Sequence, residues 1–197
     1  MLARVLKAAL AAFALVSAAV PAAAMTVRPA TFDQLVDTAA VVFEGEVTEN
    51  RAARDESGNI VTYTTFTVRD AVKGSPGATY TIKQVGGTLP AENLTYKVEG
   101  VPTFKVGETY VVFLPAQSSR GFSSPVAMSQ GRFGVTQRGN GRRVANGRDL
   151  GEMTRQIPTA QLPPQAAAAL RNAPGPVYEL DIDDFKQLVR TRAGRAR

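Results

Sequence analysis

An unbroken apolar run marks the strand around which we expect the rest of the chain to be arranged. Residues 110–114 (YVVFL) follow a turn at residues 105–108 and are closed by Pro115. A run this short between turn signals is typical of a strand that is buried on both faces. We therefore expect the neighbouring strands to pair around it in one core.

Alternation of apolar and polar positions predicts several more strands. They are expected at residues 41–47, 60–72, 79–85, 94–98 and 126–137, with a hairpin at 137–148. Gly45, inside the first of these strands, indicates a bulge or a close crossing of two backbones. Short strands with bends at glycine fit a mainly β fold, a small antiparallel OB-like barrel. A two-sheet sandwich gives the same local pattern and is the alternative.

Helical patterns precede and follow these strands. Thr31 and Gln34 form a capping box at the start of a short helix over residues 31–39. Asp181 or Asp183 can cap a second helix. Its apolar stripe consists of Ile182, Phe185, Leu188 and Val189. The expected fold is therefore an OB-like barrel with a short N-terminal helix and a C-terminal helix.

The order of these patterns divides the chain into four segments. Residues 1–24 combine a positive start, an apolar stretch and small residues up to Ala24, which is the pattern of a cleaved secretory signal peptide. An uncleaved anchor is the alternative, but the apolar stretch is shorter than the about 20 residues that a membrane span needs. The remaining segments are the β domain 25–150, a Pro- and Ala-rich linker 151–177, and the C-terminal helix with a basic tail 178–197. The protein is thus expected to be periplasmic or secreted.

The chain contains neither histidine nor cysteine. This excludes Ser-His and Cys-His nucleophiles, the usual zinc sites, haem attachment and disulfides. We expect no enzyme activity, no cofactor and no metal; an enzyme that uses carboxylates alone is the remaining catalytic alternative. The formal charge of +6 becomes +4 (6 − 2) when Arg4 and Lys7 leave with the signal peptide, so the mature protein is mildly basic.

Three clusters that could carry chemistry have simpler structural interpretations. The acidic residues at 181–184 lack the glycine and the distant glutamate of an EF-hand loop, so helix capping is favoured over metal binding. Lys73 and Ser75 lie in a turn rather than in the strand-to-helix setting that a nucleophile needs. Gly86 and Gly87 do not lead into a helix, so they do not form a phosphate-binding loop.

Arginines are concentrated around the expected hairpin. The candidates for an anionic surface are Arg138, Arg142, Arg143 and Arg148. Because Arg142 and Arg143 point to opposite faces of a hairpin, a solvated rim is favoured, and anionic glycan or lipid is the alternative partner. Nucleic acid is not expected as the partner of an exported protein. The tyrosines are interpreted as sheet packing rather than as a stacking platform.

Several short motifs, in their order, resemble a group of exported bacterial proteins of unknown function. They are AAVVFEGEV (39–47), YTTFTV (63–68), VKG (72–74), QVGG (84–87), VGE (106–108), VFL (112–114) and MSQGRF (128–133). The resemblance covers most of residues 32–135 and includes the late Asp-Phe helix. It implies an exported protein without an established activity.

The same layout is similar, more distantly, to netrin-like modules and tissue inhibitors of metalloproteinases, which are OB-like barrels. In those inhibitors the amine and carbonyl of an N-terminal cysteine bind the protease zinc, and a small hydroxyl residue comes next. The expected mature chain begins Met25-Thr26, so Thr26 lies in the matching place, whereas the cysteine is absent. The resemblance implies an exported metalloprotease as a candidate partner.

These observations favour a non-enzymatic exported binding module that engages another exported protein, with a protease as one candidate. The candidate partner-binding residues are the expected N-terminus and polar or glycine positions within the motifs: Met25, Thr26, Glu44, Lys73, Gly86, Gly87 and Gln130. The alternative function is that of an envelope structural protein, which would bind anionic glycan or lipid through an arginine-rich surface.

Overall fold

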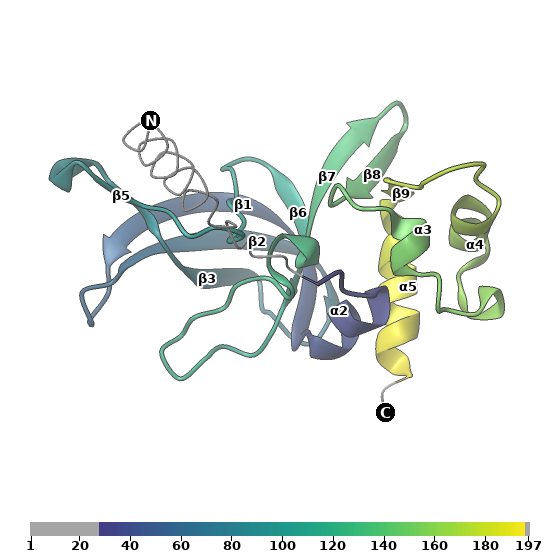
Figure 1. Cartoon of the computed structure of the whole chain (residues 1–197), viewed down its shortest axis with the longest axis horizontal. Coiled ribbons are helices and arrows are strands. Elements are labelled where there is room, and N and C mark those ends of the chain that lie inside the picture. Colours follow the sequence, from purple (N-terminus) through teal and green to yellow (C-terminus); the bar gives the residue numbers. More distant parts are fainter. Residues whose placement is uncertain (1–27, 196–197) are drawn as a thin grey trace, which may run out of the picture.

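In the computed structural model of the protein, residues 28–195 are described. The expected signal peptide, Met25 and Thr26 lie outside the described residues. The described part is mainly β and contains a seven-stranded sheet, a separate two-stranded hairpin and several short helices (Figure 1). Within residues 28–195, no helix combines the length and the apolar composition that crossing a membrane requires.

The seven strands of the main sheet are antiparallel and lie in the order β3-β2-β1-β6-β7-β8-β9. Their bounds are β1 Val41–Arg54, β2 Ile60–Lys73, β3 Thr79–Val85, β6 Thr109–Leu114, β7 Arg132–Arg138, β8 Gly141–Ala145 and β9 Leu180–Asp181. β6 contains the predicted central strand and is the fourth of the seven; Tyr110 to Leu114 are all buried. The predicted antiparallel β class is confirmed.

The main sheet is open within the described residues, because its edge strands β3 and β9 do not pair with each other. The prediction of an OB-like barrel therefore goes further than the strand pairing shows. β1 changes register at three places, one of them between Glu44 and Gly45. A Cβ on Gly45 would lie 2.9 Å from the ring of Phe43, so a side chain has no room at this bulge.

Alternation along β6 divides its side chains between two cores. Val111 and Phe113 belong to one core, and Val112 and Leu114 to the other. This two-sided burial explains why the run is apolar without interruption. In the first core, the ring of Phe113 lies near that of Phe185, whose centroid is 6.1 Å away in an edge-to-face arrangement.

Two helices predicted from the sequence cover the first core. α2 (Phe32–Thr38) begins with the predicted capping box, in which the Thr31 hydroxyl accepts from the Gln34 N–H and the Gln34 side chain accepts from the Thr31 N–H. α5 (Ile182–Gly194) is capped by Asp181 and buries its apolar stripe. In Figure 1 the yellow helix α5 lies beside α2 at one end of the sheet.

An ion pair with a buried arginine joins α2 and α5. Nε and Nη2 of Arg192 each donate a hydrogen bond of 2.7 Å to the carboxylate of Asp33. Nη1 of the same guanidinium donates to Gln161. Arg192 is only 2% exposed, so this planar two-bond contact fixes α5 against α2 inside the folded protein.

The Pro- and Ala-rich segment 151–177 also packs onto the first core, although its composition predicts a linker. Most of it is occupied by three short helices: α3 (Leu150–Met153), η3 (Thr159–Gln161) and α4 (Pro164–Arg171). Five of its apolar side chains are buried in this core: Met153, Ile157, Leu162, Ala166 and Leu170. The prolines keep the helices short, whereas the apolar residues between them dock the segment. It is therefore part of the folded domain.

Candidate functional site

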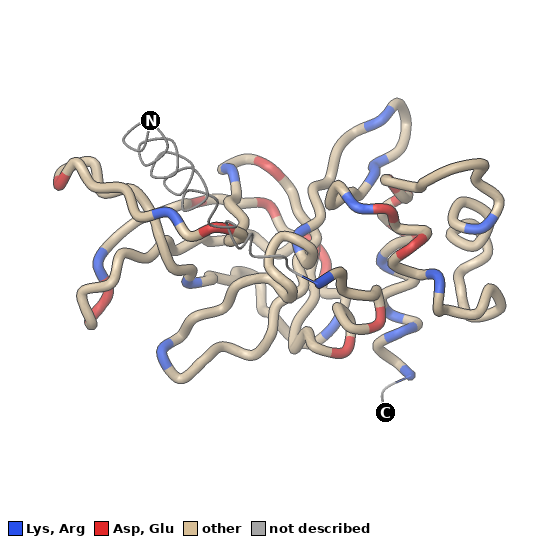
Figure 2. Tube along the Cα trace, viewed as in Figure 1, with Lys and Arg blue, Asp and Glu red and all other residues tan. Residues whose placement is uncertain are grey.

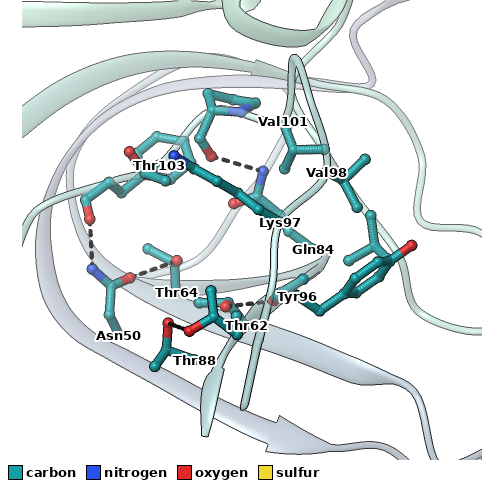
Figure 3. Close-up of a pocket in the computed structure, with 16 residues that line it drawn as sticks. Asn50, Thr62, Thr64, Gln84, Thr88, Tyr96, Lys97, Val98, Val101 and Thr103 are labelled. Atoms are coloured by element: carbon teal, nitrogen blue, oxygen red, sulfur yellow. Dashed lines mark hydrogen bonds between the residues drawn. The ribbon is translucent and has the colours of Figure 1, made fainter. Parts of the chain in front are cut away.

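A cavity of about 490 Å³ lies where β3 passes into the two-stranded hairpin (Figure 3). This β4–β5 hairpin consists of β4 (Gly87–Leu89), the turn η1 (Pro90–Glu92) and β5 (Leu94–Tyr96). Strands β1, β2 and β3 supply one wall of the cavity, and the hairpin and the loop that follows it supply the others. In Figure 1 the hairpin extends beyond the end of the main sheet.

Two glycines bring the hairpin against the sheet. Gly86 has a φ of +93°, and a Cβ there would lie 2.8 Å from the carbonyl oxygen of Tyr96. At Gly87 a Cβ would lie 2.7 Å from the hydroxyl oxygen of Thr62. Both positions need glycine, because a side chain would push β5 or β2 away. Gly86 and Gly87 are the two predicted partner-binding residues of the described part that line this cavity.

The threonine hydroxyl groups on the inner wall of the cavity donate their hydrogen bonds to other groups of the protein. The Thr64 hydroxyl donates to Oδ1 of Asn50, and Nδ2 of Asn50 donates to the Phe104 carbonyl, both at 2.7 Å. The Thr62 hydroxyl donates to the Gly86 carbonyl at 2.7 Å. These two threonines therefore present oxygen lone pairs, rather than protons, to the cavity.

Gln84 is the most buried amide of the site, with only 3% of its surface exposed. It lies on β3 two residues after Ile82, so the two side chains point to the same, inner side of the strand. Its Nε2 donates to the Pro102 carbonyl at 3.3 Å. Among the described residues no donor reaches its Oε1, and this oxygen points toward the middle of the cavity in Figure 3.

The cavity is nearly free of charge. Lys97 is the only Lys, Arg, Asp or Glu among the described residues that line it. Tyr96, which lines the cavity, is 50% exposed, and Leu94 of the same strand is 40% exposed. A cavity that is nearly free of charge suits recognition of a neutral group better than acid–base chemistry.

Glu44, a predicted partner-binding residue, lies in a buried ion cluster under α5. Its side chain is 2% exposed, its Oε2 accepts from Lys186 Nζ at 3.0 Å, and its Oε1 accepts from Arg142. Lys186 also lies 3.0 Å from Oδ2 of Asp70. Burial lowers the pKa of Lys186, but hydrogen bonds to Glu44, Asp70 and Asp183 raise this pKa above its ordinary value. The cluster ties the last helix to β1 and β2.

Lys73, a second predicted residue, closes the end of α2. Its Nζ donates hydrogen bonds of 2.6 Å to the carbonyls of Val36 and Ala39. A cation at the C-terminal end of a helix satisfies carbonyls that lack a helical partner and interacts favourably with the helix dipole. The contacts of Lys73 are therefore those of a structural residue.

Gln130, a third predicted residue, anchors the start of the described chain. It lies in the short helix η2 (Met128–Gly131) and is 3% exposed. Its Oε1 accepts from the Ala30 N–H at 2.8 Å, and its Nε2 donates to the Arg28 carbonyl at 3.0 Å. This pair of hydrogen bonds holds the segment that leads into α2.

The predicted arginines do not gather into one surface. Arg138 lies 3.1 Å from Glu179, and Arg142 is paired with the buried Glu44. Arg143 follows Arg142 on β8, so its side chain points to the other face. Figure 2 shows Lys and Arg interspersed with Asp and Glu along the chain rather than segregated by sign.

Arg148 lines a second cavity of about 490 Å³, between the start of the described chain and α3. Asp149 and Glu152 line the same cavity. Oδ1 of Asp149 accepts from the N–H groups of Gly151 and Val177, so this carboxylate supports the local backbone. The acidic neighbours weaken the attraction of Arg148 for an anionic polymer.

The acidic residues near the start of α5 serve the helix. Asp181 accepts from the Asp183 N–H, and the Asp183 carboxylate lies 3.2 Å from Lys186. Burial raises the pKa of the neighbouring Asp184, and the charges of Asp181 and Asp183 add to this effect. In the part of the chain that the structure describes, no three His, Cys, Asp or Glu side chains are grouped to hold a metal ion.

The sequence analysis missed Gln84, Thr62 and Asn50 as residues of the cavity. The sequence does contain a signal for Gln84. It lies two residues after Ile82, so alternation places both side chains on the buried face of β3. A polar residue at such a position needs a partner, which can be a ligand. The contributions of Asn50 and of the loop after β5 come from distant parts of the chain, so no local pattern indicates them.

Comparisons with protein-family models, with curated proteins and with solved structures gave no match to this chain. The interpretation of the cavity therefore rests on its own geometry. That geometry combines a glutamine oxygen that faces the cavity, two glycines that admit the hairpin, and exposed apolar side chains on the hairpin.

Proposed function

We propose that the protein is a non-enzymatic binding module, periplasmic or secreted, that engages another exported protein. The observation that carries the proposal is the open, nearly uncharged cavity beneath a hairpin with exposed apolar side chains. Large pockets with apolar walls and a few polar groups are the usual form of binding sites. The proposed binding face is the cavity together with Leu94 and Tyr96.

The hairpin has two properties that suit contact with a partner. Leu94 and Tyr96 alternate with Thr95, so both point to the same side of β5. Among residues 28–195, β5 pairs with β4 alone, which leaves its other edge able to form backbone hydrogen bonds with an added strand. Exposed apolar side chains at the edge of a cavity are typical of interaction sites.

An OB-like relationship and an exported metalloprotease as partner are parts of the same proposal. The OB-like relationship is supported by the three-stranded meander β1-β2-β3. The sheet continues with β6, which pairs with the other side of β1. A parallel bridge from Lys83 of β3 to Phe122, in the loop after β6, adds a contact in the direction that closure would take. The proposal of a metalloprotease as partner rests on the likeness to tissue inhibitors of metalloproteinases.

The envelope alternative has less support from the geometry. Two of its four arginines, Arg138 and Arg142, are already paired with carboxylates. A surface made by the other two arginines, Arg143 and Arg148, would be small. It is kept as an outcome of the experiment below, which would recover anionic polymer or lipid that salt elutes.

The test is a pull-down from envelope and culture fluid with mature protein that starts at Met25. We expect one exported protein to be enriched, and to be lost with the double variant Leu94→Ser/Tyr96→Ser. The matched control is Val106→Ser/Tyr178→Ser, because these two side chains are 59% and 53% exposed on other parts of the surface. Equal capture by both double variants, or capture of polymer alone, would contradict the proposal.

A parallel bait with extra residues before Met25 tests the N-terminal wedge. If Met25 and Thr26 contact a protease zinc as the resemblance implies, the extension abolishes capture of that protease. If the cavity and hairpin carry the contact, both baits capture the partner equally. The result assigns the interface to one end of the molecule or to the other.

A further inference from the structure

We infer that the cavity receives one tryptophan side chain of the partner protein, with the indole N–H donated to Oε1 of Gln84. The inference rests on the proposed function, because it names the group by which the partner is recognised. It is argued from the hydrogen-bonding capacity, the charge and the size of the cavity.

The hydrogen-bonding capacity of the inner wall calls for a donor. Nε2 of Gln84 is turned to the Pro102 carbonyl, which leaves Oε1 without a donor among the described residues. The hydroxyl protons of Thr62 and Thr64 are given to Gly86 and Asn50. A ligand that enters the cavity takes water away from this oxygen, so a ligand that donates to it gains more than one that leaves it unpaired.

The charge of the lining excludes a cationic donor. No Asp or Glu belongs to the described residues that line the cavity, and Lys97 adds a positive charge at its rim. A lysine or arginine side chain would therefore be desolvated without a counter-charge, which is strongly unfavourable. The donor has to be neutral.

Among neutral groups, an indole matches best because it donates and does not accept. A peptide backbone or a sugar brings carbonyl or hydroxyl acceptors, for which Thr62 and Thr64 have no free hydroxyl proton. The walls that an aromatic ring would contact are apolar: Val85, Val98, Val101, Pro102 and Phe104. A cavity of about 490 Å³ has room for an indole. Tryptophan is also among the residues that most often anchor protein interfaces.

The chain itself makes the test direct, because it contains no tryptophan. An added indole is then the only indole fluorophore in the sample. The probe is N-acetyltryptophanamide, titrated with the mature protein. We expect a saturable blue shift of its emission, with a dissociation constant on the order of 0.1–1 mM for a ligand of this size.

The comparison probe is the 1-methylindole analogue, which keeps the ring and lacks the N–H. We expect it to bind about tenfold more weakly, since it leaves Oε1 of Gln84 unpaired. In Gln84→Leu the two probes should bind equally, because the acceptor is gone. The comparison of the two probes on the unchanged protein needs no variant, so it stands even if Gln84→Leu does not fold.

Three results would overturn the inference. One is equal binding of the two probes to the unchanged protein, and another is the absence of a saturable shift. The third is probe binding that leaves capture of the partner unchanged, because the cavity would then hold a free small molecule rather than a side chain. Capture that depends on the hairpin but is indifferent to the probe removes this inference and leaves the proposed function standing.

Discussion

The ammonium of Lys186 lies 3.0 Å from Oε2 of Glu44, across 142 residues of sequence. Both side chains are almost fully buried, with exposed fractions of 7% and 2%. Glu44 comes just before the register shift at Gly45, so the irregular part of β1 carries the acid that the last helix needs. The contact joins the start of the sheet to the end of the chain.

The first prediction concerns this pair. Lys186→Met leaves Glu44 buried with Arg142 as its remaining partner, and we expect the free energy of unfolding to fall by about 3 kcal/mol. The measurement is urea unfolding of the variant and of the unchanged protein. The double variant Glu44→Gln/Lys186→Met should recover part of the loss, because the isolated carboxylate is removed.

Lys105→Met is the matched control for this experiment. Lys105 pairs with Glu108, but its side chain is 77% exposed. A solvated ion pair contributes about 0–1 kcal/mol, so this variant should be nearly neutral. Equal losses in the two lysine variants would show that the buried cluster has no special role in stability.

The second prediction concerns acid stability. The ion pair with Lys83, at 2.9 Å, lowers the pKa of Asp55 to about 2, and backbone N–H groups of Asn59 and Ser57 contribute. Because the folded pKa lies below the ordinary one of 3.8, this stabilisation is complete above pH 3.8 and is lost as the pH falls through about 2.

The free energy of unfolding, measured between about pH 5 and pH 2, tests this prediction. Asp55→Asn should be less stable than the unchanged protein at the upper end, and the difference should shrink toward the lower end. The exposed neighbour Glu56 supplies the control variant Glu56→Gln. A constant difference across the whole range would be inconsistent with a lowered pKa at Asp55.

The third prediction concerns the hairpin. Gly86→Ala places a methyl group 2.8 Å from the Tyr96 carbonyl, and we expect it to loosen β5 and to weaken binding of the indole probe. Gly107→Ala is the control, since its φ of +83° is similar but nothing lies within 4 Å of the added Cβ. Both variants bear the cost of a left-handed alanine, about 1 kcal/mol.

The difference between these two variants in probe binding and in the amide exchange of β5 therefore reports the effect of the contact with Tyr96. Amide exchange of β5 should rise in Gly86→Ala and remain unchanged in Gly107→Ala. Unchanged probe affinity in Gly86→Ala would separate the hairpin from the cavity.

The fourth prediction concerns the start of the described chain. Gln130→Leu removes the acceptor of the Ala30 N–H, so we expect the exchange of this amide to accelerate about tenfold. The Leu35 amide, which donates to the Thr31 carbonyl in α2, should keep its rate. Gln137→Leu is the control variant, because the Gln137 side chain is exposed and bonds only to the nearby Gly139 carbonyl. No change at Ala30 would show that Gln130 is not its anchor.

Local patterns predicted the elements well where the relevant contacts are close in sequence. The capping box of α2 spans three residues, and the stripe of α5 repeats within a single helix. The length of β6 follows from its own apolar run. The order of the strands and the docking of residues 151–177 depend on contacts between distant segments, which no local period records.

The candidate site was predictable only in part for the same reason. Gly86 and Gly87 stand out in the sequence, and the structure places them at the cavity. Lys73 and Gln130 also stand out, but their hydrogen bonds hold the backbone of α2 and of the segment before it. Motif membership alone does not distinguish a glycine that admits a hairpin from a lysine that closes a helix.

The pairing of Arg192 with Asp33 also determines when the protein can finish folding. These residues are 159 positions apart, so the ribosome delivers α2 long before α5. Until α5 is made, Phe113 and Phe133 lack the ring of Phe185 that covers them in the finished core. The nascent chain therefore stays incompletely folded, and accessible to chaperones, until α5 has been synthesised.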